Sequence, residues 1–246
     1  MPNSPDLLFS VITPSAGNRP RALALAIGSV LAAAERARRE LGFDPARLEM
    51  LVGFDGVEGE RPASTLGNLR FYTIPRPQGL ESGFGNHVRH ALMGAARGRY
   101  LLLLDDDNAL AEGALTAWLP LVDGPDRANR ADRAGAPELL IARIDTSRAF
   151  DVPLLPRPCP PGADPVQDAI RQGNIDPLCL CLSRELAYVR CRGWENEGGY
   201  ESDFLNIRRY HRRARGVARI DDVVGVYDAG RGLDPQGLNP RQKKLA

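Results

Sequence analysis

Short apolar runs alternate with amphipathic stretches along the first half of this chain. The runs have the length of β-strands, and they lie at residues 9–13, 48–54, 69–74 and 101–104. Between them, residues 21–41 and 86–96 carry apolar side chains at helical spacing, and a glycine-rich turn is expected at 79–85. Strands that alternate with helices are typical of a mostly parallel sheet covered by helices. The pattern therefore predicts an α/β fold.

The second half of the chain has a more broken pattern. The expected strands are 139–144, 175–182 and 223–227, and the expected helices are 112–122, a short one from 185, and 202–213. The polar stretch 123–137 predicts a solvated loop or a frayed helix, and the proline-rich stretch 152–165 and the glycine-containing stretch 193–199 predict loops. No internal repeat or linker divides the sequence, so we expect a single domain over 1–246, with a flexible tail or lid at 230–246.

Three consecutive carboxylates, Asp105, Asp106 and Asp107, follow directly after the apolar run 101–104. Their mutual repulsion excludes them from a core and places them at the carboxyl end of the strand, where open α/β sheets bind ligands. A divalent cation would relieve this repulsion and could bring a phosphate-rich substrate with it. Taken alone, the run is equally compatible with an acidic surface loop.

Composition narrows the class of protein. A net charge of +1 over 246 residues gives no electrostatic reason to expect nucleic acid or anionic membrane as a partner. No apolar run is long enough to span a bilayer, and the N-terminus lacks the features of a secretion signal, so a cytoplasmic protein is expected. Cys179 and Cys181 are interpreted as small core residues, with metal binding a weaker alternative.

Five motifs, in chain order over residues 9–227, resemble those of the family-two nucleotide-sugar glycosyltransferases of the GT-A fold. They are 10–14 with 18–20, 54–56, 85–108, 173–176 with 183–184, and 200–204 with 208–209. The chain departs from the family pattern at Phe54, where an aspartate is usual, and at His90, where an asparagine is usual. It also has an extra residue near 16–17 and no histidine after His211 that could complete a metal site; Asp228 or water would substitute.

The resemblance implies a GT-A fold with a nucleotide-sugar-binding half at about 9–122 and a smaller acceptor and catalytic half at about 138–229. The implied activity is metal-dependent, inverting transfer of a sugar from a nucleoside-diphosphate sugar, with a UDP-sugar favoured, to a hydroxyl acceptor. The implied cofactor is Mn²⁺ or Mg²⁺, held by Asp107 and Asp105. The implied donor-binding residues are Thr13, Pro14, Ser15, Asn18, Arg19, Asp55, Asn86, Arg89, Asp105 and Asp106.

Some of these donor-site residues have an ordinary structural interpretation as well. Asp55 would bind the nucleotide base, but followed by Gly56 it could equally cap a turn. Arg19 and Arg89 could donate to phosphate, or they could be solvated arginines on helix faces, because arginine is abundant throughout this chain.

The acceptor hydroxyl needs a base, and a carboxylate is the natural choice. Asp203 and Glu201 stand at the start of the helix expected at 202–213, where a carboxylate also serves as a cap. Asp203 lies six residues before Arg209, as the catalytic aspartate does in the family, so Asp203 is the first candidate and Glu201 the second. Asp176 is expected on the acceptor side.

Two other classes of function compete with the transferase. A catalytically silent nucleotide-sugar-binding protein of the same fold would explain the departures at Phe54 and His90. A sugar-1-phosphate nucleotidylyltransferase is disfavoured, because its glycine-rich N-terminal phosphate loop is absent. His87 and His90 could form a metal pair, and the basic helix around His211 could contact phosphate, but ordinary structural roles are preferred for all three histidines.

Overall fold

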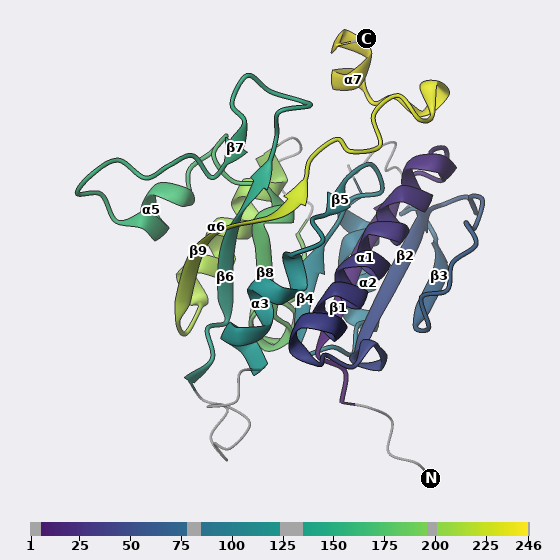
Figure 1. The fold of residues 1–246 in the computed structure, drawn as a ribbon. Coiled ribbons are helices and arrows are strands. Elements are labelled where there is room, and N and C mark those ends of the chain that lie inside the picture. Colours follow the sequence, from purple (N-terminus) through teal and green to yellow (C-terminus); the bar gives the residue numbers. More distant parts are fainter. Residues whose placement is uncertain (1–5, 78–84, 124–134, 196–200, 246) are drawn as a thin grey trace.

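One twisted sheet runs through the molecule in this computed structural model, which describes residues 6–77, 85–123, 135–195 and 201–245 (Figure 1). Its strands have the order β3-β2-β1-β4-β8-β6-β9-β5, and β7 pairs with β6 off this path. Their bounds are β1 Phe9–Ser15, β2 Leu48–Asp55, β3 Leu69–Ile74, β4 Tyr100–Leu103, β5 Ala109–Leu110, β6 Leu139–Asp145, β7 Leu154–Leu155, β8 Leu180–Ser183 and β9 Val217–Val226.

The strands β1 to β4 are parallel to one another, with Phe9 of β1 opposite both Leu48 of β2 and Tyr100 of β4. Beyond β4 the sheet becomes mixed, because β8 is antiparallel to β4 and to β6 while β9 is parallel to β6. The predicted α/β class is therefore confirmed. Since β1, β2 and β4 run the same way, their carboxyl ends meet at one edge, and the loops of that edge build the candidate site.

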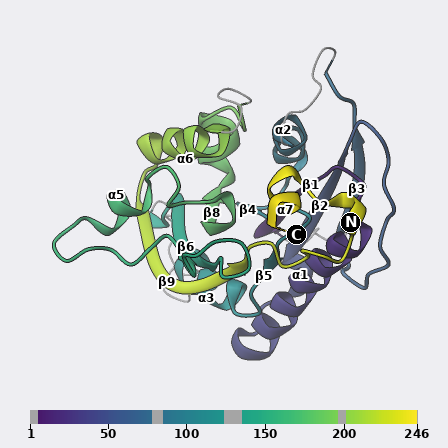
Figure 2. The ribbon, with the colours of Figure 1, turned by 90° about the horizontal axis from the view of Figure 1, so that it is seen from above.

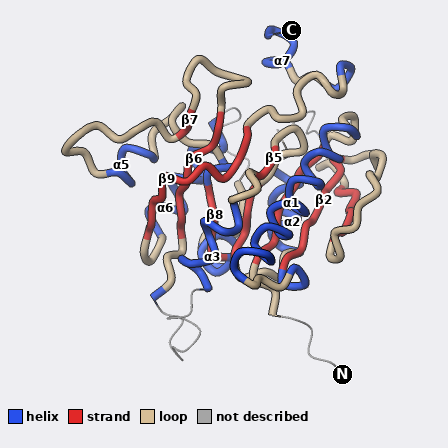
Figure 3. The backbone as a smooth tube through the Cα atoms, viewed as in Figure 1, coloured by secondary structure: helices blue, strands red, loops and turns tan. Residues whose placement is uncertain are grey.

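Helices cover both faces of the sheet, as Figure 2 shows from above; Figure 3 draws these helices in blue and the strands in red. One face carries α1 (Pro20–Leu41) and α3 (Ala114–Asp123), and the other carries α2 (Asn86–Ala95) and α6 (Ser202–Arg213). Two shorter helices, α5 (Pro165–Ala169) and α7 (Pro240–Leu245), lie outside these layers. The predicted end of the first helix is confirmed, since Gly42 caps α1 with a φ of 67°, which glycine adopts without strain.

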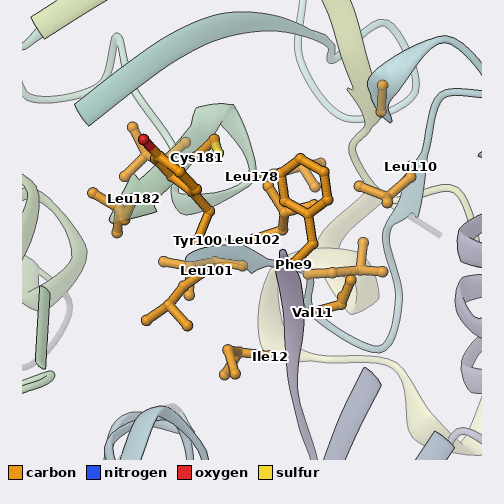
Figure 4. Packing of buried hydrophobic residues seen from close by; sticks show 14 of the residues in the cluster. Phe9, Val11, Ile12, Tyr100, Leu101, Leu102, Leu110, Leu178, Cys181 and Leu182 are labelled. Carbon is orange, nitrogen blue, oxygen red and sulfur yellow. The ribbon is translucent and has the colours of Figure 1, made fainter. Parts of the chain in front are cut away.

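Burial on both faces explains the apolar strands. The four leucines from Leu101 to Leu104 are at most 2% exposed, and Figure 4 shows β4 packed with Phe9, Val11 and Cys181 from its neighbours. Gly98, just before β4, lies so close to the backbone of β1 that a Cβ atom there would come within 2.6 Å of Ser10 N. Glycine is therefore required where the chain enters the central strand.

The structure corrects the predicted elements mainly in the second half. The strand predicted at 175–182 is wrong in its first part, because Asp176 caps a 3₁₀ turn at Pro177–Cys179 and β8 begins only at Leu180. The segment after β8 is a π-helical turn, Glu185–Arg190, and β9 begins six residues earlier than predicted. The structure also adds β5, β7, α5 and α7, which were not predicted. Most of the turn predicted at 79–85 and most of the loop at 123–137 lie outside the described residues, as does the end of the loop at 193–199.

Candidate active site

The three consecutive carboxylates occupy the turn between β4 and β5, at the carboxyl edge of the sheet. They differ in exposure: Asp106 is fully buried, the side chain of Asp107 is 13% exposed, and that of Asp105 is 38% exposed. A single acidic run therefore presents one carboxylate to solvent and draws the other two inward. Such burial of negative charge requires cationic or N–H partners.

Arg19, in the loop between β1 and α1, supplies this partner. Its guanidinium NH2 lies 2.5 Å from Asp106 Oδ1, and its NH1 donates to Asp107 Oδ2. Ser15 Oγ, at the end of β1, donates to Asp106 Oδ2 at 2.5 Å. Burial nevertheless raises the pKa of Asp106 to about 7, against the opposing charge of Arg19, and burial also raises the pKa of Asp107.

The remaining predicted residues of the first loop lie around this contact. Thr13 is fully buried in β1, and its hydroxyl has no hydrogen-bond partner among the described residues. Pro14 lies against Gly85, which precedes α2, and Asn18 stands next to Arg19 in the loop. The structure thus gathers the predicted residues of this loop at the carboxyl end of β1, beside the acidic run.

A second arginine, Arg89 of α2, links the acidic run to the opposite side of the site. Its side chain is only 2% exposed; NH2 donates to Asp105 Oδ1 at 2.6 Å, and NH1 lies 3.6 Å from Asp203 Oδ1. The guanidinium also stacks over the ring of Trp194, 4.7 Å from the ring centroid. Arg89 therefore joins the end of β4 to the start of α6.

Asn86 reinforces this connection between α2 and α6. Its side-chain oxygen accepts from Trp194 Nε1 at 2.8 Å, and its nitrogen donates to Ser202 Oγ at 2.9 Å. Asn86 and Ser202 are buried, so these hydrogen bonds are shielded from water. Trp194 was not predicted as a site residue, because a single tryptophan in a loop does not indicate which residues it will contact.

Asp203 lies in the first turn of α6 and keeps 43% of its side chain exposed. Burial of its inner side raises its pKa, which the charge of Arg89 opposes. Glu201, two residues earlier, is exposed and accepts a hydrogen bond from Gln172 Nε2 at 2.7 Å. Of the two candidate bases, Asp203 is the one in contact with the arginine that holds Asp105.

Asp176 belongs to the same group of charges. Its side chain accepts from Leu178 N at 2.8 Å and so caps the 3₁₀ turn before β8. Burial, together with the negative charges of Asp203 and Asp105, raises its pKa to about 8. The structure therefore brings Asp176, Asp203 and Asp105 around Arg89.

Asp55, at the end of β2, contacts one cationic and one basic side chain. Arg76 Nε lies 2.9 Å from Asp55 Oδ1, and His87 Nε2 lies 3.1 Å from the same oxygen. His90 Nδ1 lies 3.1 Å from the carbonyl of Trp194. The two histidines of α2 therefore lie beside different groups, and neither ring nitrogen of His87 has a hydrogen-bond partner among the described residues.

Asp228 also reaches the acidic run, from the residues that follow β9. It is fully buried, has a φ of 61°, which is unusual for a residue with a Cβ atom, and its backbone N–H donates to Asn108 Oδ1 at 2.7 Å. Gln242 Nε2 donates to Asp107 Oδ2 at 3.0 Å and also to Asp228 Oδ1. Arg241 NH2 lies 3.0 Å from Asp228 Oδ2. Gln242 and Arg241 were missed, because nothing distinguishes them in a polar tail.

The chemistry of these oxygens fits a hard divalent cation, because Asp107 and Asp228 converge on one nitrogen atom of Gln242. Within the described ranges, no three His, Cys, Asp or Glu side chains gather in an arrangement that could hold a metal ion. The nearby positions are taken by N–H donors from Arg19, Arg241 and Gln242. The described residues thus offer two convergent carboxylates, Asp107 and Asp228, each already contacted by an N–H donor or a cationic side chain.

No protein-family model matches this sequence, and no curated protein matches it either. Solved structures do resemble its fold. S. aureus TarS 1-349 superposes with a TM-score of 0.65 at 16% identity over 89% of this chain, and its complex with UDP-GlcNAc superposes with 0.59 at 14% identity over 89%. The mannosyltransferase PcManGT from Pyrobaculum calidifontis, in complex with GDP-Man and Mn²⁺, gives 0.51 at 15% identity over 89%.

These likenesses show that the chain has the fold of the GT-A glycosyltransferases, as predicted. The chain covers 60%, 58% and 56% of those three structures, respectively, so it spans well under two thirds of their length. Among the described residues, no helix is long and apolar enough to cross a membrane.

Proposed function

We propose that this chain is an inverting glycosyltransferase that moves a sugar from a nucleoside-diphosphate sugar, preferably a UDP-sugar, to a hydroxyl acceptor. The observation that carries the proposal is the link from Asp105 through buried Arg89 to Asp203, at the carboxyl edge of a GT-A sheet. In this proposal Asp105 serves the donor and Asp203 is the base, and both carboxylates pair with the same guanidinium. The nucleotide-sugar complexes among the similar structures support the substrate class.

On the donor side, the loop after β1 and the end of β2 would bind the nucleotide. Asp55 would accept a hydrogen bond from the edge of the base, and Asp105, which is partly exposed, would accept from the ribose. Bound Mn²⁺ or Mg²⁺, held by Asp107 with Asp105 or Asp228, would neutralise the charge that grows on the diphosphate as the bond to the sugar breaks. Arg19 lies beside these carboxylates and can donate to a phosphate oxygen.

On the acceptor side, Asp203 would take the proton of the attacking hydroxyl. Its carboxylate is partly exposed and lies 3.6 Å from the buried guanidinium of Arg89. Attack by one hydroxyl on the face opposite the leaving diphosphate inverts the anomeric configuration in a single displacement. Asp176, on the same side, would bind an acceptor or sugar hydroxyl.

The proposed role of Asp107 as a metal ligand is tested by Asp107→Asn. A neutral amide is a poorer ligand for a hard cation than a carboxylate, so UDP affinity in the presence of Mn²⁺ should fall by about tenfold or more. Titration calorimetry of UDP with and without Mn²⁺ measures this. Asp221→Asn, a change at an exposed carboxylate of β9, is the control and should behave like the wild type. Equal affinities in the wild type and Asp107→Asn would remove Asp107 from the metal site.

The proposed hydrogen bond between Asp55 and the nucleotide base is tested by Asp55→Ala. Loss of a partly buried hydrogen-bond acceptor for the base should weaken nucleotide binding by roughly 1–3 kcal/mol. The control is Asp44→Ala, because Asp44 is exposed and caps a 3₁₀ turn through Ala46 N at 2.9 Å. If Asp55→Ala lowers stability but leaves nucleotide affinity as high as in Asp44→Ala, then Asp55 has a structural role only.

A further inference from the structure

The C-terminal segment folds back over the carboxyl edge of the sheet. Figures 1 and 2 show α7 above the ends of β1 and β4, between α1 and α2. Gly230 N donates to Asp107 O at 2.9 Å, and a Cβ atom on Gly230 would lie within 2.5 Å of Ala22 Cβ. The segment therefore leaves β9 in direct contact with the acidic run and with the start of α1.

Two side chains of α7 contact the carboxylates at which a cation would bind. Gln242 is 1% exposed, and its amide nitrogen donates to both Asp107 and Asp228. The guanidinium of Arg241 is paired with Asp228 and lies 5.2 Å and 5.3 Å from the ring centroids of Tyr227 and Phe150. The amide nitrogen of Gln242 therefore lies between the two carboxylates, at the position that a cation bridging Asp107 and Asp228 would occupy.

A second contact anchors the segment away from the carboxylates. The first turn of α1 has no side-chain cap of its own, and Asp234 supplies one by accepting from Ala22 N at 2.8 Å and from Arg21 N at 3.3 Å. The backbone at Gly237 lies against the side chain of Arg19, where a Cβ atom would clash. The docked C-terminal segment thus contacts both the acidic run and the loop that carries Arg19.

We propose that Arg241 and Gln242 are an internal ligand of the cation pocket formed by Asp107 and Asp228, and that the metal and the diphosphate displace them on binding. The inference rests on the proposed function, because it assumes a cation at these carboxylates. The amide nitrogen of Gln242 and a cation that bridges Asp107 and Asp228 need the same position, so each weakens the binding of the other by the same factor. The docked C-terminal segment therefore lowers the affinity of these carboxylates for the cation.

The first test compares Mn²⁺ binding to three full-length proteins, measured from the electron paramagnetic resonance of free Mn²⁺. They are the wild type, R241A/Q242A, and the control K243A/K244A, which changes exposed side chains of the same helix. Removal of the internal ligand should lower the apparent Kd for Mn²⁺ by about tenfold, and the control should leave it unchanged. An unchanged or higher Kd in R241A/Q242A would overturn the proposal.

The second test uses wild-type protein and amide hydrogen exchange of residues 234–245. Addition of Mn²⁺ and UDP should speed exchange in this segment if the segment is displaced. Slower exchange would show that the segment closes over the ligands, and it would overturn the proposal. If calorimetry detects binding of Mn²⁺ and UDP while exchange stays unchanged or slows, only this inference fails. If neither the wild type nor R241A/Q242A binds Mn²⁺ or UDP, the proposed function fails with it.

Discussion

Replacement of Asp203 by asparagine is expected to reduce sugar transfer by roughly 10²–10⁴, the range typical of a lost general base. Asparagine has nearly the same shape and fits the same position, 3.6 Å from the guanidinium of Arg89. It cannot take a proton from the acceptor. Donor and metal binding should therefore stay close to those of the wild type, because the proposal assigns them to other residues, among them Asp55 at the end of β2 and Asp107 in the β4–β5 turn.

The measurement is single-turnover transfer with saturating donor, once an acceptor is known. The matched control is Glu201→Gln, which changes the exposed neighbouring carboxylate that contacts Gln172. A loss of transfer in the control and not in Asp203→Asn would assign the base to Glu201. Full activity in both variants would remove the start of α6 from the mechanism. A wild type that binds donor but neither transfers nor hydrolyses it would favour a silent binding protein.

The first half of the fold could be predicted, because a strand that is buried on both faces is a continuous apolar run in the sequence. The leucines of β4 and the apolar run of β2 stand out from the sequence without knowledge of tertiary contacts. The second half gave a weaker signal. In the segment 175–182, apolar residues continue through Pro177, but the cap formed by Asp176 and the fixed φ of proline favour a 3₁₀ turn. Tertiary position, rather than hydrophobicity, decides where β8 begins.

The sequence predicted which residues lie near one another at the candidate site, but it did not predict which of their side chains form ion pairs and hydrogen bonds. The sequence indicates that Asp105, Asp106 and Asp107 share one loop, but it cannot indicate which carboxylate is buried. It also offers many arginines, so the selection of Arg19 and Arg89 rested on the family resemblance. The contacts of Gln242 arise from a return of the chain over more than a hundred residues, for which local sequence carries no signal.

Replacement of Arg89 by methionine is expected to have the largest effect on stability. The side chain is 2% exposed and is paired with Asp105 and Asp203, so its loss leaves two carboxylates without their cation. Loss of one partner from a buried ion pair costs about 3–5 kcal/mol. Because the two carboxylates are 38% and 43% exposed and can turn toward water, we expect the lower end of that range, about 3 kcal/mol. Urea unfolding followed by circular dichroism measures the difference.

Arg36→Met is the matched control, because Arg36 pairs with Glu40 on the exposed surface of α1. Loss of that pair should change the free energy of unfolding by only about 0.5 kcal/mol. A double variant then isolates the cause. If the penalty in Arg89→Met comes from the orphaned charges, neutralising one of them with Asp203→Asn in the same chain should recover about 1 kcal/mol. Strictly additive effects would show instead that Arg89 acts through its packing on Trp194, and that Asp203 does not depend on Arg89 for its position.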